Sequence, residues 1–116
     1  MRTLLVLPVL LAIAAPAPAA PQQATAQLGQ IVRFGGLAVR PIKVLEDSRC
    51  PRMVTCVWRG RLRVSIQVGQ RRVALDDGVP VKVRGGELTL VDAIPVSARG
   101  EQVATGAYRF RLRYDR

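Results

Sequence analysis

A two-residue alternation of apolar and polar positions between residues 54 and 68 is the clearest pattern in this chain. The odd positions are mostly polar and include three arginines. The even positions are all apolar or small: Val54, Cys56, Trp58, Gly60, Leu62, Val64, Ile66 and Val68. A period of two is typical of a strand with one buried and one solvated face. Because this stretch is long for a single strand, we expect a bend or bulge at Gly60.

Shorter apolar runs, separated by glycine-containing turns, predict further strands on both sides of this stretch. Pro80 restricts the run 79–83 to the edge of a sheet, because proline has no N–H to donate to a neighbouring strand. The predicted strands are 30–34, 37–45, 54–68, 73–75, 79–83, 88–91 and 108–114. About seven short strands, with no sustained 3.6-residue period, predict an all-β fold, a single-domain antiparallel β-sandwich or open barrel.

Residues 1–26 have the layout of a secretory signal peptide. Arg2 precedes an apolar run over 4–15, and a stretch of small residues follows. The run is too short for a transmembrane helix, and small residues predict cleavage after Ala19 or after Ala26. We therefore expect a β-sandwich domain over 27–116, in the periplasm or secreted, with no transmembrane anchor after cleavage.

Both cysteines lie in the stretch 50–56. In an oxidising compartment they are expected to form a disulfide, Cys50–Cys56, which would stabilise the fold by about 2 kcal/mol. Cys56 and Trp58 share one parity, so the indole is expected to point inward and pack beside the disulfide. Asp47 is expected to cap this loop, with Arg49 available to it. Asp47, Pro51 and Trp58 are thus the predicted supports of the loop and core.

Three functional interpretations compete with this structural one. Cys50, Met53 and Cys56 form C-x2-M-x2-C, a set of soft ligands suited to Cu(I) if the thiols stay reduced. A redox role would favour C-x-x-C instead. A disulfide-closed loop that carries Arg49 and Arg52 could present a basic side chain to a trypsin-like protease, as an inhibitor does.

The run Asp47-Ser48-Arg49-Cys50-Pro51, followed by Cys56-Val57-Trp58 and Gly60, resembles the "DSRCP…CVW.G" signature of small exported bacterial proteins. In these proteins a predicted β domain follows a signal peptide. The resemblance covers about 14 residues and implies a secreted or periplasmic domain of uncharacterised activity. It adds no catalytic residues, and the Met53 position varies among the members, which weakens the copper interpretation.

The composition argues against catalysis. The chain has no histidine, which removes the common nucleophilic triads and every histidine zinc site. Adjacent carboxylates such as Asp76 and Asp77 point to opposite faces of a strand, so adjacency does not make a catalytic pair. No glycine-rich phosphate loop or calcium loop is present. We therefore expect a protein that is not an enzyme and that holds no metal or cofactor.

Arginine dominates the charge of the chain, with 16 arginines against two lysines and a net charge of +10. Alternation places two groups of three arginines on the solvent faces of their strands. These candidate anion-binding residues are Arg59, Arg61, Arg63, Arg109, Arg111 and Arg113. If both strands belong to one sheet, they form a platform for a polyanion, either an anionic lipid headgroup or an envelope glycan, or for a protein. The scarcity of outward aromatic residues disfavours nucleic acid.

Overall fold

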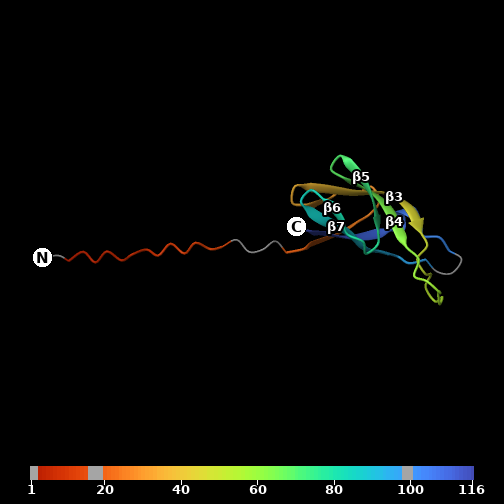
Figure 1. The fold of residues 1–116 in the computed structure, drawn as a ribbon, viewed down its shortest axis with the longest axis horizontal. Coiled ribbons are helices and arrows are strands. Elements are labelled where there is room, and N and C mark those ends of the chain that lie inside the picture. The colour runs from red at the N-terminus through yellow and green to blue at the C-terminus, as the bar shows by residue number, and fades with distance from the viewer. Residues whose placement is uncertain (1–2, 16–19, 98–100) are drawn as a thin grey trace.

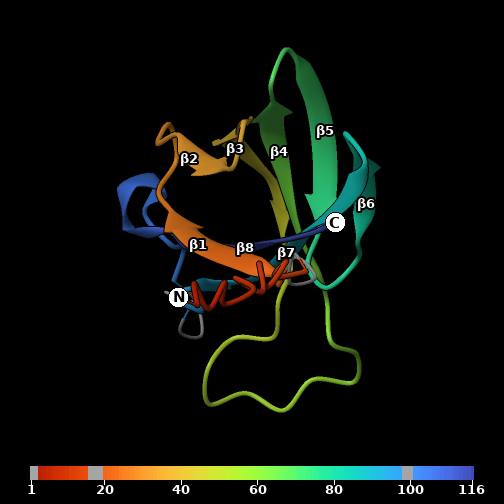
Figure 2. The same ribbon diagram turned by 90° about the vertical axis from the view of Figure 1, so that its left-hand side faces the viewer.

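The protein is a sandwich of two antiparallel four-stranded sheets, seen in a computed structural model that describes residues 3–15, 20–97 and 101–116. The strand orders are β1-β8-β7-β6 and β2-β3-β4-β5 (Figures 1 and 2). The elements are β1 (Gln22–Ala26), β2 (Val32–Phe34), β3 (Leu37–Asp47), β4 (Leu62–Val68), β5 (Arg71–Asp76), β6 (Val81–Val83), β7 (Gly86–Ile94), the 3-10 helix η1 (Thr105–Ala107) and β8 (Arg109–Asp115). The predicted all-β sandwich is confirmed, and β6, which follows Pro80, is an edge strand as expected.

The core lies between the sheets and is built by the predicted alternation. In β4 the even positions are buried and the odd positions are half-buried. In β8, Phe110 and Leu112 are fully buried, and Tyr114 is nearly so. The period of two thus placed the inner face of both central strands correctly, because only one face of each strand leaves water.

The first strand of the sandwich lies upstream of residue 27, where the sequence places the start of the domain. Residues 22–26, assigned from the sequence to the leader, form β1 and pair with β8 from Gln22↔Tyr114 to Ala26↔Phe110. Ala26 is completely buried in the core. The sandwich therefore begins upstream of residue 27. Residues 3–15 form no helix or strand and extend away from the sandwich (Figure 1), and the predicted cleavage site after Ala19 lies outside the described residues.

The strand expected over 54–68 begins only at Leu62. Residues 48–61, which we call the cysteine loop, leave the sheet between β3 and β4 and project from the sandwich (Figure 2). Gly60, expected to bend a continuous strand, instead lies in the loop before β4 begins. Its φ is +69°, and a Cβ there would lie 1.8 Å from the Ser48 carbonyl oxygen. Only glycine fits this position.

The sandwich has two different ends (Figure 1). At one, which we call the hairpin end, tight two-residue turns at 35–36, 69–70 and 84–85 close three hairpins. At the other, which we call the loop end, lie the cysteine loop, the 77–80 connection and the start of β8. The candidate functional residues divide between these two ends.

Candidate functional site

The predicted disulfide is present in the cysteine loop. Cys50 and Cys56 are bonded, with their Cα atoms 5.9 Å apart. A Cu(I) site would need both sulfur atoms as thiolates. Since each sulfur is bonded to the other, the predicted ligand set is not available in this structure.

The base of the cysteine loop is held by one ion pair that reaches both sheets. Arg49 donates from Nε and Nη2 to the two carboxylate oxygens of Asp47, at 2.7 and 2.9 Å. Its Nη1 and Nη2 also donate to the carbonyl oxygens of Ala93 at 2.6 Å and Pro95 at 3.0 Å, at the end of β7. Tyr108, beside β8, donates its hydroxyl to Asp47 Oδ2 at 2.7 Å. This cluster fixes the loop to β3, β7 and β8 together.

The electrostatics of this cluster follow from its burial, since the side chains of Arg49 and Asp47 are only 13% and 16% exposed. Burial alone would raise the pKa of Asp47, but hydrogen bonds from Arg49 and Tyr108 outweigh it and hold this pKa below its ordinary value. Burial, together with the bond to Asp47, raises the pKa of Tyr108 to about 12. Asp47 is therefore charged and Tyr108 neutral over the physiological range.

Arg52, the candidate protease-binding residue, is bound back to the sandwich. Its backbone N–H donates to Ser97 O at 2.9 Å, and its Nε donates to Val96 O at 3.1 Å. Met53, the next residue, has a φ of +63°. A protease holds its inhibitors in extended conformation, which a left-handed residue interrupts. The half-buried Pro51 precedes this turn.

The tip of the cysteine loop is apolar and faces solvent. Trp58 is 77% exposed and does not pack in the core, contrary to the expectation from its parity. The prediction is wrong because residues 54–60 lie outside the sheet, where alternate side chains do not point to a buried and a solvated face. The three most exposed large apolar side chains of the described sandwich all belong to this loop: Met53, Val57 and Trp58. We call these three residues the apolar tip.

The six arginines predicted to form one platform are divided between the two sheets. Arg63 lies on β4, with Arg59 and Arg61 just before it, whereas Arg109, Arg111 and Arg113 lie on β8. β4 and β8 belong to opposite layers of the sandwich, so their solvent faces point in opposite directions. The single platform is therefore not formed.

Most of these six arginines are also neutralised locally. Five form ion pairs: Arg59–Asp77 at 2.9 Å, Arg61–Glu46 at 2.5 Å, Arg63–Asp76 at 2.8 Å, Arg113–Asp115 at 2.9 Å, and Arg111–Asp92. Arg109 instead donates to the carbonyl oxygens of Gly106 and Tyr108. The arginine hydrogen bonds hold the pKa of Asp76 and of Asp92 below the ordinary value. With Asp47, six of the eight carboxylates are engaged by arginine.

Five further arginines that have no carboxylate partner among the described residues lie at the hairpin end. Arg40 and Arg72 lie opposite Gln67 in one row across β3, β4 and β5, and Arg33 lies on the adjacent β2. Arg71 and Arg84 lie beside the neighbouring turns. Among the residues that the structure describes, none of these five pairs with Asp or Glu. We call Arg33, Arg40, Arg71, Arg72 and Arg84 the hairpin-end cations.

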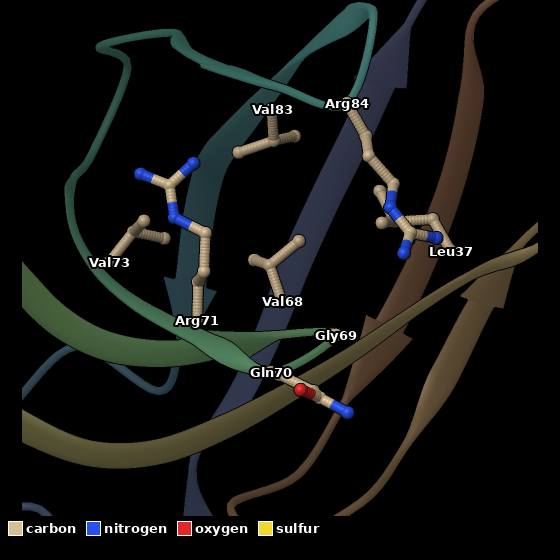
Figure 3. Close-up of a pocket in the computed structure, with 8 residues that line it drawn as sticks. All are labelled: Leu37, Val68, Gly69, Gln70, Arg71, Val73, Val83 and Arg84. Atoms are coloured by element: carbon tan, nitrogen blue, oxygen red, sulfur yellow. The ribbon is translucent and has the colours of Figure 1, made fainter.

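Two of the hairpin-end cations extend over a cleft of about 410 Å³ (Figure 3). Arg71 and Arg84 approach it from opposite sides, with Val68 and Val83 between them. Its other lining residues are Leu37, Gly69, Gln70 and Val73, and none of the lining residues is acidic. The cleft thus combines apolar walls with charge of one sign.

Arg84 holds a strained conformation at the edge of this cleft. Its φ is +39° and that of Gly85 is +75°, so both central residues of the β6–β7 turn are left-handed. Such turns favour asparagine or glycine at the first position, and a bulky side chain there is uncommon and strained. Backbone strain of this kind collects at functional positions.

Sequence patterns did not single out the hairpin-end cations, because they are scattered from residue 33 to residue 84 and only sheet pairing brings them together. Comparison with protein-family models, with curated proteins and with solved structures finds no match. In the described ranges, no helix is long and apolar enough to span a bilayer. Nor, over those same ranges, do three or more His, Cys, Asp or Glu side chains gather where they could hold a metal ion.

Proposed function

We propose that this chain is an exported, non-enzymatic binding module that holds an acidic envelope component, of the anionic-polysaccharide type, at its hairpin end. One observation carries the proposal: among the described residues the five hairpin-end cations have no carboxylate partner, while six of the arginines elsewhere in the sandwich form ion pairs. A cation that is not neutralised by its own protein is available to an external anion.

The cleft strengthens the attraction. Apolar walls of low dielectric constant focus the field of charges of one sign and raise the local concentration of oppositely charged ligands. Arg71 and Arg84 can each offer paired N–H donors to a carboxylate, sulfate or phosphate group. The row of Arg40, Gln67 and Arg72 provides a second line of contact for a polymer.

Export is supported by three features of the chain. The leader has the layout of a signal peptide, the cysteines form a disulfide as is usual in oxidising compartments, and the motif around them resembles that of small exported bacterial proteins. The protease-inhibitor alternative is less well supported, because Arg52 is bound to the sandwich and precedes a left-handed residue.

The test is a titration with polygalacturonate, a soluble polyanion, at low and at physiological ionic strength. We expect salt-sensitive binding that falls at least about tenfold in the triple variant Arg40→Gln, Arg72→Gln, Arg84→Gln, because each change removes charge-assisted hydrogen bonds. The matched control is Arg59→Gln, Arg111→Gln, Arg113→Gln, which removes the same charge from exposed ion pairs. The control should bind within about threefold of the natural protein.

Equal losses in the two triple variants would show that net charge alone attracts the polymer, and the hairpin-end site would then be wrong. Binding that persists unchanged in both variants would also contradict it. Folding of each variant is checked by its thermal melt, so that a loss of structure is not mistaken for a loss of contacts.

A further inference from the structure

We infer that the apolar tip of the cysteine loop inserts into the interface of an anionic bilayer, and so anchors the protein by the end opposite its proposed anion site. Met53, Val57 and Trp58 are 105%, 96% and 77% exposed, whereas the next large apolar side chain of the described sandwich, Ile94, is 57% exposed. Single exposed apolar residues are ordinary, but three that are this exposed within six positions of one projecting loop indicate a contact surface.

The loop is built to present this cluster rather than to collapse. The disulfide closes its tip, and the Asp47–Arg49–Tyr108 cluster fixes its base. Between them, the backbone N–H of Ser48 donates to Arg61 O at 2.8 Å, and that of Cys50 donates to Arg59 O at 3.3 Å. A loop held in this way loses little conformational freedom when its tip becomes covered.

The size and charge of the apolar tip favour a bilayer, rather than a protein, as the surface that it contacts. Three side chains cover much less than the roughly 800 Å² that each partner contributes to a stable protein interface. Shallow insertion needs only a small apolar area with electrostatic support. Tryptophan is enriched at membrane interfaces. Arg52 and Arg59 flank the tip, no acidic residue lies between them, and the whole chain carries a charge of +10, which complements anionic headgroups.

The position of the tip keeps the two proposed contacts separate. The cysteine loop projects from the loop end of the sandwich (Figure 1). The hairpin-end cations lie on or near the turns that define the other end. A protein anchored by its loop would therefore hold the cleft away from the bilayer, open to a polymer in the surrounding solution. The inference does not depend on the polyanion proposal, because it uses different residues.

Trp58 is the only tryptophan in the chain, so intrinsic fluorescence reports directly on the tip. The experiment mixes the purified protein with vesicles of phosphatidylcholine containing one quarter phosphatidylglycerol, and with vesicles of phosphatidylcholine alone. We expect a blue shift of Trp58 emission with the anionic vesicles, and strongest quenching by lipids brominated near the headgroup end of the acyl chain. The variant Met53→Ser, Val57→Ser should weaken vesicle binding about tenfold or more.

The control variant Ile31→Ser, Val79→Ser removes two apolar side chains, 52% and 51% exposed, from elsewhere on the sandwich. It should keep the natural affinity for vesicles. Absence of a blue shift with anionic vesicles, or equal weakening in both variants, would overturn the inference. A blue shift that grows with protein concentration in the absence of lipid would also overturn it, since a second copy would then cover the tip. Polygalacturonate binding by Met53→Ser, Val57→Ser should remain normal, which separates failure of this inference from failure of the proposed function.

Discussion

The two ends of this sandwich use arginine in opposite ways. At the loop end, Arg49 satisfies a carboxylate and two backbone carbonyls and is 13% exposed, so its charge is used to hold the structure together. At the hairpin end, Arg71 and Arg84 extend over a cleft that has no acidic lining residue. Arginine therefore stabilises the fold at one end of the sandwich and remains available to bind an external anion at the other.

Each end also contains a non-glycine residue in the left-handed region, Met53 at the loop end and Arg84 at the hairpin end. Both side chains belong to the surfaces that we propose as contacts. A strained backbone that is kept beside an exposed side chain suggests that presentation of the side chain matters more there than local stability. Substitution of an arginine that holds the fold together should strongly lower the free energy of unfolding. Substitution of an arginine that is available to a ligand should change this free energy little.

The largest effect is expected at the base of the cysteine loop. Arg49→Ala leaves Asp47 with Tyr108 as its remaining side-chain partner and removes the donors to Ala93 O and Pro95 O. Loss of one member of a mostly buried pair should lower the free energy of unfolding by about 3 kcal/mol, measured by urea denaturation. Arg59→Ala, whose side chain is 77% exposed, should cost less than about 0.5 kcal/mol. Similar losses in the two variants would contradict the proposed difference between structural and exposed arginines.

A smaller change in the free energy of unfolding is expected when the pH is raised, because Tyr108 of the Asp47–Arg49–Tyr108 cluster then loses its proton. The pKa of Tyr108 is raised by burial, and by its bond to Asp47, to about 12, while the unfolded chain titrates near 10. Between these values the unfolded state releases its proton first, so stability present below pH 10 should be lost as the pH rises toward 12. The loss should reach about 2 kcal/mol.

Tyr108→Phe should remove this alkaline loss, measured as the change in urea midpoint between pH 9 and pH 11.5 relative to the natural protein. Tyr114→Phe is the matched control, because Tyr114 donates to Arg84 O and has no carboxylate partner among the described residues. An alkaline loss that is unchanged in Tyr108→Phe would show that other groups cause it.

The smallest effect is expected at the hairpin end, with the opposite sign. Arg84→Asn places a residue favoured in left-handed turns before Gly85, and should raise the free energy of unfolding by about 1 kcal/mol. It should also weaken polygalacturonate binding, because stability and binding compete at this position. Arg71→Asn removes the same charge without a left-handed backbone, so it should weaken binding without the gain in stability. A destabilised Arg84→Asn protein would contradict this account.

The sandwich could be predicted from the sequence because apolar residues recur at every second position when one face of a strand is buried. The sequence also predicted the disulfide and the edge position of β6, which depend on local chemistry alone. The predicted inward position of Trp58 is wrong because the alternating pattern continues on the N-terminal side of Gly60, where the chain lies outside the sheet. Nothing in a single strand pattern shows where pairing stops.

The candidate site was harder to predict, since it depends on which strands are neighbours. Arg59, Arg61 and Arg63 looked available in the sequence, but their carboxylate partners come from β3, from β5 and from the turn after β5. Arg40 and Arg72 looked isolated, yet sheet pairing places them in one row. Alternation identifies the outward face of a strand but not its partners across the sheet.

The position of β1 distinguishes the two cleavage sites that the sequence predicts for the leader. β1 covers one edge of β8, and Ala26, the last residue of β1, is buried in the core. A protease cut after Ala26 would remove β1 and leave the hydrogen-bonding groups of β8 open, an edge that can recruit strands from other molecules and start aggregation. A cut after Ala19 would leave the strand in place. The choice between these two predicted sites, seven residues apart, would therefore decide whether the edge of β8 is covered by β1 or open to other chains.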